Sequence, residues 1–183
     1  REQFLPFLNI IKQNSIHKEL IIDVDYRKIG SEKLEGLFTP LDEKTKFKIN
    51  HIFRKLTKNK KKENFTINVK GRKFEIREFY EGISKFDFKD LCDDNLGAED
   101  YIKISENCKI IIIENIPDFN DEKINQQNRF ITLIDILYEK KIPIIISIEK
   151  SIENINSSKK LVEPFKRTTS RLFELTSVSQ NFL

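Results

Sequence analysis

Several residue types that build metal centres and disulfide scaffolds are scarce in this 183-residue sequence, which has two cysteines, two histidines and no methionine. Cys92 and Cys108 are too few for a disulfide framework or a zinc quartet, so we expect reduced, partly buried thiols. His17 and His51 are too few and too far apart for a metal centre or a histidine-based catalytic dyad. The longest uninterrupted apolar run, residues 110–113, is far shorter than the ~20 residues of a membrane helix. The composition therefore predicts no metal site and no integral membrane segment.

Glycine-rich phosphate-binding motifs are also missing. A P-loop requires G-x-x-x-x-G-K-[ST], because its glycines let backbone N–H groups close on the phosphates, and a dinucleotide site requires G-x-G-x-x-G. None of the glycines begins either motif; they are Gly30, Gly36, Gly71, Gly82 and Gly97. We therefore expect no phosphate cradle, and no bound cofactor, in this chain alone.

Basic and acidic side chains nearly balance, at 33 and 29, for a net charge of +4. This lacks the strong basic excess of nucleic-acid-binding proteins. The lysine-rich run 58–62 could attract nucleic acid or anionic lipid, but no aromatic residues interleave it to stack on bases. We favour a solvated loop and expect no nucleic-acid partner.

The distribution of apolar residues predicts an α/β fold with a partly parallel sheet. Short apolar runs rich in β-branched residues predict strands at 20–24, 109–114 and 143–148, and helical spacing predicts helices at 4–11, 42–56 and 125–140. A final helix is expected around 165–172. The strand, helix and strand over about 109–148 form a βαβ crossover, in which the two strands should be parallel.

A β-hairpin insertion is expected at about 65–76, because apolar residues alternate on both sides of a turn at Gly71. Phe86 and Phe88 indicate another short strand, and residues 97–105 a helix. Gly30 and Gly36 are expected in a loop. The hairpin could also pair with a strand of a partner protein.

Polar residues at two strand ends suggest a possible catalytic position. Glu114 and Asn115 end one apolar strand and Ser147 lies near the end of the next, as in ATPases where an acidic strand end holds Mg²⁺ beside a polar sensor. We nevertheless favour a plain strand-end role for Glu114. Asp93, Asp94 and Asp100 could suggest a metal site, but we expect loop and helix-start acids.

Three further charged residues lie on the last two predicted helices. Asp135 flanks the apolar stripe of the 125–140 helix, where a charge needs a partner, so we favour an intramolecular ion pair. Arg167 and Arg171 are four residues apart and project together from the final helix. They either grip a phosphate or carboxylate, or form a basic edge paired with Glu163 or Glu174.

Read together, these segments resemble the C-terminal half of the ZapE-type cell-division ATPases, which belong with the mitochondrial ATPase-family-gene-one proteins in a branch of the AAA+-like P-loop ATPases. The matching stretches occur in the family's order. They are 1–7 (REQFLPF), 24–27 (VDYR), 86–88 (FDF), 91–92 (LC), 96–98 (LGA), 100–101 (DY), 129–135 (RFITLID), 137–138 (LY) and 167–172 (RTTSRL). The blocks at Arg129 and Arg167 are the most specific.

The resemblance implies a parent protein that hydrolyses ATP with Mg²⁺, at the division septum on the tubulin-like ring protein or in mitochondrial quality control. It suggests that Arg1 is an arginine finger acting in a neighbouring subunit. It places Arg167 and Arg171 where a lid arginine would sense the γ-phosphate, and it gives Arg129 and Asp135 structural or coupling roles.

We therefore expect residues 1–183 to be a single C-terminal region of a longer ATPase, because the Walker A and B motifs lie upstream of the matching part of the family. Residues 1–40 would end the ATPase core and 41–183 would form a C-terminal α/β part, inert alone, that supplies lid, coupling and partner-binding surfaces. Expected partners are the rest of the ATPase core and further copies in a homo-oligomer. The expected location is cytoplasmic, or mitochondrial in a eukaryote. The alternative is a stand-alone protein-interaction module without nucleotide chemistry.

Overall fold

The computed structural model describes residues 34–178. The chain divides into two units between Glu32 and Lys33. The expected helix at 4–11, the strand at 20–24 and the predicted arginine finger Arg1 lie outside the described residues.

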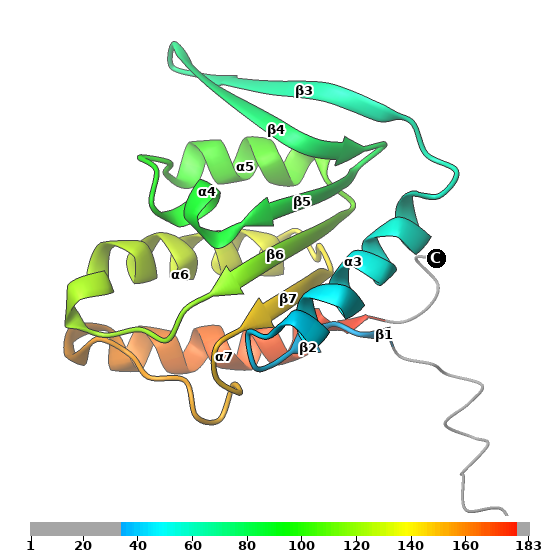
Figure 1. Cartoon of the computed structure of the whole chain (residues 1–183). Helices are drawn as coiled ribbons and strands as arrows, with labels where there is room; N and C mark the ends of the chain where they lie inside the picture. The colour runs from blue at the N-terminus through cyan, green and yellow to red at the C-terminus, as the bar shows by residue number, and fades with distance from the viewer. Residues whose placement is uncertain (1–33, 179–183) are drawn as a thin grey trace, which may run out of the picture. The chain divides into compact units, whose positions relative to one another are not determined.

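A mixed six-stranded sheet forms the centre of the second unit, and the expected α/β fold is confirmed (Figure 1). Its strand order is β2–β7–β6–β5–β4–β3, and the first four of these strands are parallel. In that order the strands are Leu37–Phe38, Ile144–Ile148, Ile110–Ile116, Ile83–Asp87, Arg72–Tyr80 and Lys62–Val69. Since β6 and β7 are parallel neighbours joined by a helix, the βαβ crossover is confirmed as well.

Helices cover both faces of this sheet. The α3 helix (Glu43–Thr57) lies on one face, and α5 (Ala98–Asn107), α6 (Ile124–Glu139) and α7 (Val162–Thr176) lie on the other, as Figure 1 shows. Strand β6 therefore alternates between two cores. Its odd-numbered Ile111 and Ile113 join the core beneath α5, α6 and α7, whereas Ile110 and Ile112 join the core beneath α3. A strand covered on both faces is continuously apolar, which is the pattern seen here.

The predicted hairpin forms, and it extends the main sheet. Lys70 and Gly71 have φ values of 48° and 80°, so the turn has the left-handed conformation that suits two-residue hairpins. Strand β4 then pairs antiparallel with β5 through a second turn at Glu81 and Gly82. Strand β3 is the outermost strand on this side of the sheet.

One local expectation was wrong. Phe86 lies in β5 as expected, but Phe88 begins the short helix α4 (Phe88–Cys92), because Asp87 caps that helix and accepts a hydrogen bond from the Lys89 N–H at 3.0 Å. Gly36 lies outside any strand, as expected for a loop residue, but the connection is a single residue long. It links β2 to β1 (Leu34–Glu35), which pairs antiparallel with β8 (Ser177–Val178).

The two cysteines are buried and free, as expected. Burial raises the pKa of the Cys108 thiol to about 11, against a smaller opposing effect of its hydrogen bond with Ser84. Both thiols are therefore protonated and unreactive at neutral pH. In the described part of the chain, no helix has the length and apolar character needed to cross a membrane.

Candidate functional site

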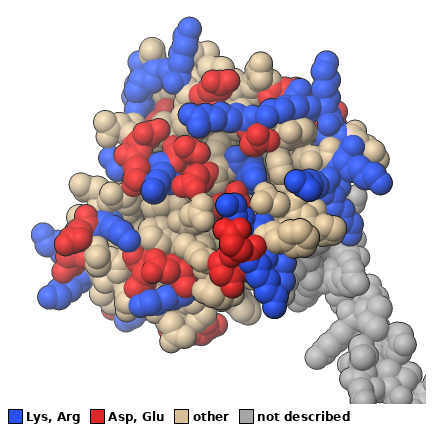
Figure 2. All heavy atoms as spheres, viewed as in Figure 1, with Lys and Arg blue, Asp and Glu red and all other residues tan. Residues whose placement is uncertain are grey.

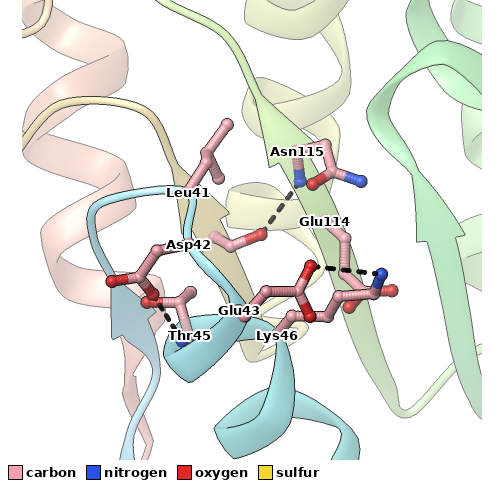
Figure 3. A pocket seen from close by; sticks show the side chains of 8 residues that line it. Leu41, Asp42, Glu43, Thr45, Lys46, Glu114 and Asn115 are labelled. Atoms are coloured by element: carbon pink, nitrogen blue, oxygen red, sulfur yellow. Dashed lines mark hydrogen bonds and ion pairs between the residues drawn. The ribbon is translucent and has the colours of Figure 1, made fainter.

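A pocket of about 350 Å³ opens where three of the parallel strands end (Figure 3). Its lining comes from the segment after β2, the start of α3, and the ends of β6 and β7. The lining residues are Leu41, Asp42, Glu43, Thr45, Lys46, Glu114, Asn115 and Ser147. Ligands of open parallel α/β sheets bind outside the carboxyl ends of the strands, so this pocket is the natural candidate site.

The N-terminus of α3 is capped by a carboxylate, whereas a phosphate-binding helix leaves its first backbone N–H groups open to the ligand. Asp42 is the N-cap, and its Oδ1 accepts a hydrogen bond from the Thr45 N–H at 2.7 Å. That backbone hydrogen bond lowers the pKa of Asp42, with a smaller contribution from the charges of Lys44 and Lys48. One backbone N–H of the helix terminus is therefore paired with an anion of the protein itself, whose charge also opposes a bound phosphate.

Glu114, the possible catalytic residue at the end of β6, forms an ion pair with a lysine of the neighbouring strand β5. Lys85 Nζ lies 3.3 Å from Glu114 Oε2, and the two side chains are only 19% and 17% exposed. Lys85 also donates to Asn50 Oδ1 at 3.0 Å and lies 5.0 Å from the centre of the Phe53 ring. These contacts support the strand-end role that we favoured for Glu114.

Asn115 connects the ends of three parallel strands. Its φ is 64°, its N–H donates to Ser147 Oγ at 2.9 Å, and its side-chain amide donates to Asp87 Oδ2 at 2.6 Å. The site is thus a polar junction of β5, β6 and β7, rich in carboxylates and unsuited to phosphate. Among residues 34–178, no group of three or more histidine, cysteine or acidic side chains is placed to hold a metal ion.

Asp135 lies at the centre of a second cluster, which joins α6 to α7. Arg167 Nη2 lies 2.8 Å from Asp135 Oδ2, and Arg171 Nη1 binds the other carboxylate oxygen. The Arg171 guanidinium also lies 4.8 Å from the centre of the Tyr138 ring. The ion pair expected for Asp135 is therefore present, but both arginines pair with Asp135 and not with Glu163 or Glu174.

The two arginines differ in how much of the side chain remains accessible. Arg171 is 20% exposed and Arg167 is 59% exposed. Arg167 therefore keeps part of its guanidinium open to a further anion while it touches Asp135. Contact of either arginine with a phosphate stays a prediction.

Arg129 holds the segment between α4 and α5. It donates to the Cys92 carbonyl at 3.0 Å and to Asn95 Oδ1 at 3.2 Å. Arg72, which the sequence did not single out, donates to the Asn95 carbonyl and pairs with Asp100 at 2.7 Å. Asp100 in turn accepts from the Gly97 N–H at 2.8 Å, as expected for a helix-start acid. The resemblance-bearing stretches 91–92, 96–98, 100–101 and 129 therefore meet in one place.

Asp118 is the centre of a network that no sequence pattern revealed. It accepts hydrogen bonds at 2.7 Å from the N–H and the side-chain amide of Asn156, and Lys150 Nζ lies 2.7 Å away. Partial burial by itself raises the pKa of Asp118, but the hydrogen bonds from Lys150 and Asn156 outweigh it, and the pKa is lowered. The network ties the segment after β7 to the end of β6.

The chain is similar in sequence to known proteins along most of its length. It is 25% identical over 177 residues to the cell division protein ZapE of Escherichia coli strain K12, covering 97% of this chain and 47% of ZapE. It is 26% identical over 158 residues to lactation elevated protein 1 homolog B of Danio rerio, covering 85% of this chain and 31% of that protein. The chain thus spans at most about half the length of these curated relatives. No solved structure matches it.

The family model for AFG1-like ATPases matches residues 1–181, nearly the whole chain. This agrees with the resemblance carried by the arginine-containing blocks of the sequence. The chain therefore belongs to the AFG1-like ATPase family.

Proposed function

We propose that this chain is the C-terminal part of a Mg-ATP-hydrolysing ATPase of cell division, and that it supplies lid, coupling and partner-binding surfaces. The observation that carries the proposal is the family match over residues 1–181, together with the similarity to about half of ZapE. The carboxylate-rich lining of the pocket, which includes Asp42 and Glu114, is consistent with a part of the protein that holds no phosphate cradle of its own. This part alone would be catalytically inert.

In this proposal Arg167 and Arg171 belong to the lid. Arg171 is held by Asp135 and Tyr138, whereas the more exposed Arg167 remains able to contact the γ-phosphate. Asp135 then couples α7 to α6, and Arg129 passes the coupling to the segment between α4 and α5. Arg1 would act as an arginine finger on the neighbouring subunit of a homo-oligomer.

The proposed setting follows the relatives. The partners would be the upstream ATPase core and the tubulin-like division-ring protein, in the cytoplasm at the septum. In a eukaryotic source the setting would be the mitochondrion.

Two linked measurements test the proposal. Calorimetric titration of the 183-residue chain with Mg-ATP should give no binding heat. In the longer polypeptide that carries the upstream P-loop, Arg167→Ala should lower kcat at least about tenfold, because a charge-stabilising group near the γ-phosphate is lost.

Lys166→Ala is the matched control, since Lys166 is exposed, neighbours Arg167 and pairs only with Glu163 on its own helix. Unchanged turnover in Arg167→Ala would remove the lid role. Micromolar binding of Mg-ATP to the short chain would mean that it contains a phosphate site of its own.

A second candidate function rests on the outer strand of the sheet. Among the described residues, strand β3 pairs only with β4, so its other edge offers backbone groups for strand addition by a partner. A module of this kind would bind its partner equally well with or without nucleotide and without the upstream half. An affinity that required the P-loop half would exclude it.

A further inference from the structure

The α3 helix turns a basic, aromatic face away from the sheet. Its buried side consists of Thr45, Ile49, Phe53 and Leu56. At about 100° per residue, the side chains on the opposite half of the helix point to solvent. Seven exposed side chains of this half are basic or aromatic, and we call them the α3 outer face: Lys44, Phe47, Lys48, His51, Arg54, Lys55 and Lys58, the last being the C-cap residue. The same half also carries the exposed acid Glu43 at its first turn.

The cations of this face form no ion pair with a described side chain, although Lys44 and Lys48 lie close enough to Asp42 to lower its pKa. The one acid of α3 is Glu43, in its first turn, and it pairs with Lys46, which lies outside the face. No other described side chain forms an ion pair with the four lysines or Arg54 of the α3 outer face. On the right side of Figure 2, over α3 and the segment after it, many blue side chains lie among tan ones.

Phe47 lies in the middle of these cations. It is nearly opposite the buried stripe, and at 73% exposure it projects further into solvent than the other exposed large apolar side chains. Around the helix axis, Lys44 and Lys48 lie on one side of Phe47 and Arg54 lies on the other, as the helical spacing requires. Basic side chains attract anionic headgroups and an aromatic side chain can enter the acyl boundary, and the α3 outer face offers both chemistries together.

We propose that the α3 outer face docks this protein on an anionic lipid surface, a binding function separate from the ATPase role proposed above. The cations from Lys44 to Lys58 span about 21 Å along the helix, enough to contact several headgroups at once. Phe47 inserts between them into the acyl boundary. Docking is peripheral, because the helix keeps its apolar side on the protein core.

The composition of the face favours lipid over nucleic acid. Its exposed side chains include none of the amides or hydroxyls that hydrogen-bond base edges, since Asn50 at its margin is partly buried and accepts from Lys85 at 3.0 Å. Four of its five cations are lysines, which act as point charges toward a diffuse anionic surface. An outward-facing phenylalanine can insert into the acyl region of a lipid surface, whereas it makes no favourable contact with a phosphate backbone.

The chain contains no tryptophan, so a single introduced indole reports insertion directly. Phe47→Trp should shift its emission to shorter wavelength with vesicles of mixed phosphatidylcholine and phosphatidylglycerol, and not with phosphatidylcholine alone. Phe173→Trp, at a position on α7 that is 66% exposed, is the matched control and should show no shift. A shift at Phe173 equal to that at Phe47, or none at Phe47, would overturn the proposal.

Vesicle sedimentation tests the charges. Lys48→Glu with Lys55→Glu should weaken binding to the anionic vesicles by at least about twenty-fold, and Phe47→Ala by about tenfold. Lys159→Glu with Lys160→Glu makes the same change in net charge on exposed residues of another segment and should leave binding nearly unchanged. Equal losses of binding in both double variants would show that only the net charge matters and would contradict the proposal. Binding to duplex DNA of equal strength, unaffected by Phe47→Ala, would contradict it as well. Circular dichroism confirms that each variant is folded.

Discussion

At the scale of single residues, carboxylates decide how this chain is held together. Two aspartates, Asp42 and Asp100, each accept a backbone N–H hydrogen bond at the start of a helix. Two others, Asp118 and Asp135, form ion pairs with lysine or arginine side chains. The sequence identified Asp100 and Asp135 as candidate residues, and Asp42 begins a predicted helix. Asp118 was not identified, because its partners Lys150 and Asn156 follow it by 32 and 38 residues.

Asp118 supplies a pH-dependent prediction. Its pKa is lowered in the folded protein, so its contribution to stability is present above the unfolded-state pKa of about 3.9 and is lost as the pH falls through the lower folded value. Asp118→Asn should therefore reduce the free energy of unfolding at pH 7 by about 1–3 kcal/mol, and by less at acid pH. Urea denaturation at both pH values measures the difference.

Asp94→Asn is the control for this prediction, since Asp94 is exposed and should tolerate the same change within about 0.5 kcal/mol. A loss for Asp118→Asn that stayed constant down to pH 3 would show that the hydrogen-bond geometry, and not the charge, is responsible.

At the scale of elements, the contact between α6 and α7 rests on one carboxylate and two unequal arginines. The half-buried Arg171 has Asp135 and the Tyr138 ring as neighbours, whereas Arg167 is largely in solvent. An exposed ion pair contributes little to stability, and a partly buried one contributes more because its loss leaves a desolvated charge. The two arginines should therefore separate in a mutational series.

Arg171→Ala should lower the free energy of unfolding by about 1–2 kcal/mol, and Arg167→Ala by less than about 0.5 kcal/mol. A double-mutant cycle with Asp135→Ala should place most of the coupling on Arg171. Equal coupling energies for the two arginines would contradict the geometry described above. The mild effect of Arg167→Ala is also what makes it suitable for the turnover assay.

At the scale of the whole molecule, the backbone of Gly36 forms hydrogen bonds with two distant segments, the end of α7 and strand β7. Its N–H donates to the Thr176 carbonyl at 3.1 Å, and its carbonyl accepts from the Ile146 N–H at 2.7 Å. A Cβ at this position would lie 2.5 Å from the Thr176 oxygen and 2.8 Å from the Ile144 oxygen, both of them backbone atoms. The close approach leaves room for glycine only.

Gly36→Ala should destabilise the protein by about 1–3 kcal/mol, because neither backbone segment can move away without breaking ladder hydrogen bonds. Thermal unfolding followed by circular dichroism measures the change. Gly97→Ala is the matched control: an added Cβ there meets nothing within 4 Å, and its cost should stay below about 1 kcal/mol. Equal melting temperatures for the two variants would mean that the chain relaxes around position 36.

The sequence by itself determined most elements of the described part. The α3, α6 and β6 segments and the hairpin were predicted because hydrophobic periodicity and turn residues act locally, within a few positions. Family membership also followed from the sequence, through contiguous blocks such as 129–135. The start of α4 at Phe88 was missed, because the capping carboxylate of Asp87 competes with an apolar alternation that continues past it.

Only the tertiary structure decided which side chains meet. It chose Asp135, and not Glu163 or Glu174, as the partner of Arg167 and Arg171, and it placed Gly36 tightly between two backbone segments. It also assembled the carboxylate-lined pocket from residues more than one hundred positions apart and left the basic side of α3 facing solvent. Such pairings depend on strand order and helix placement, which arise from burial over the whole sheet and leave no mark in local spacing.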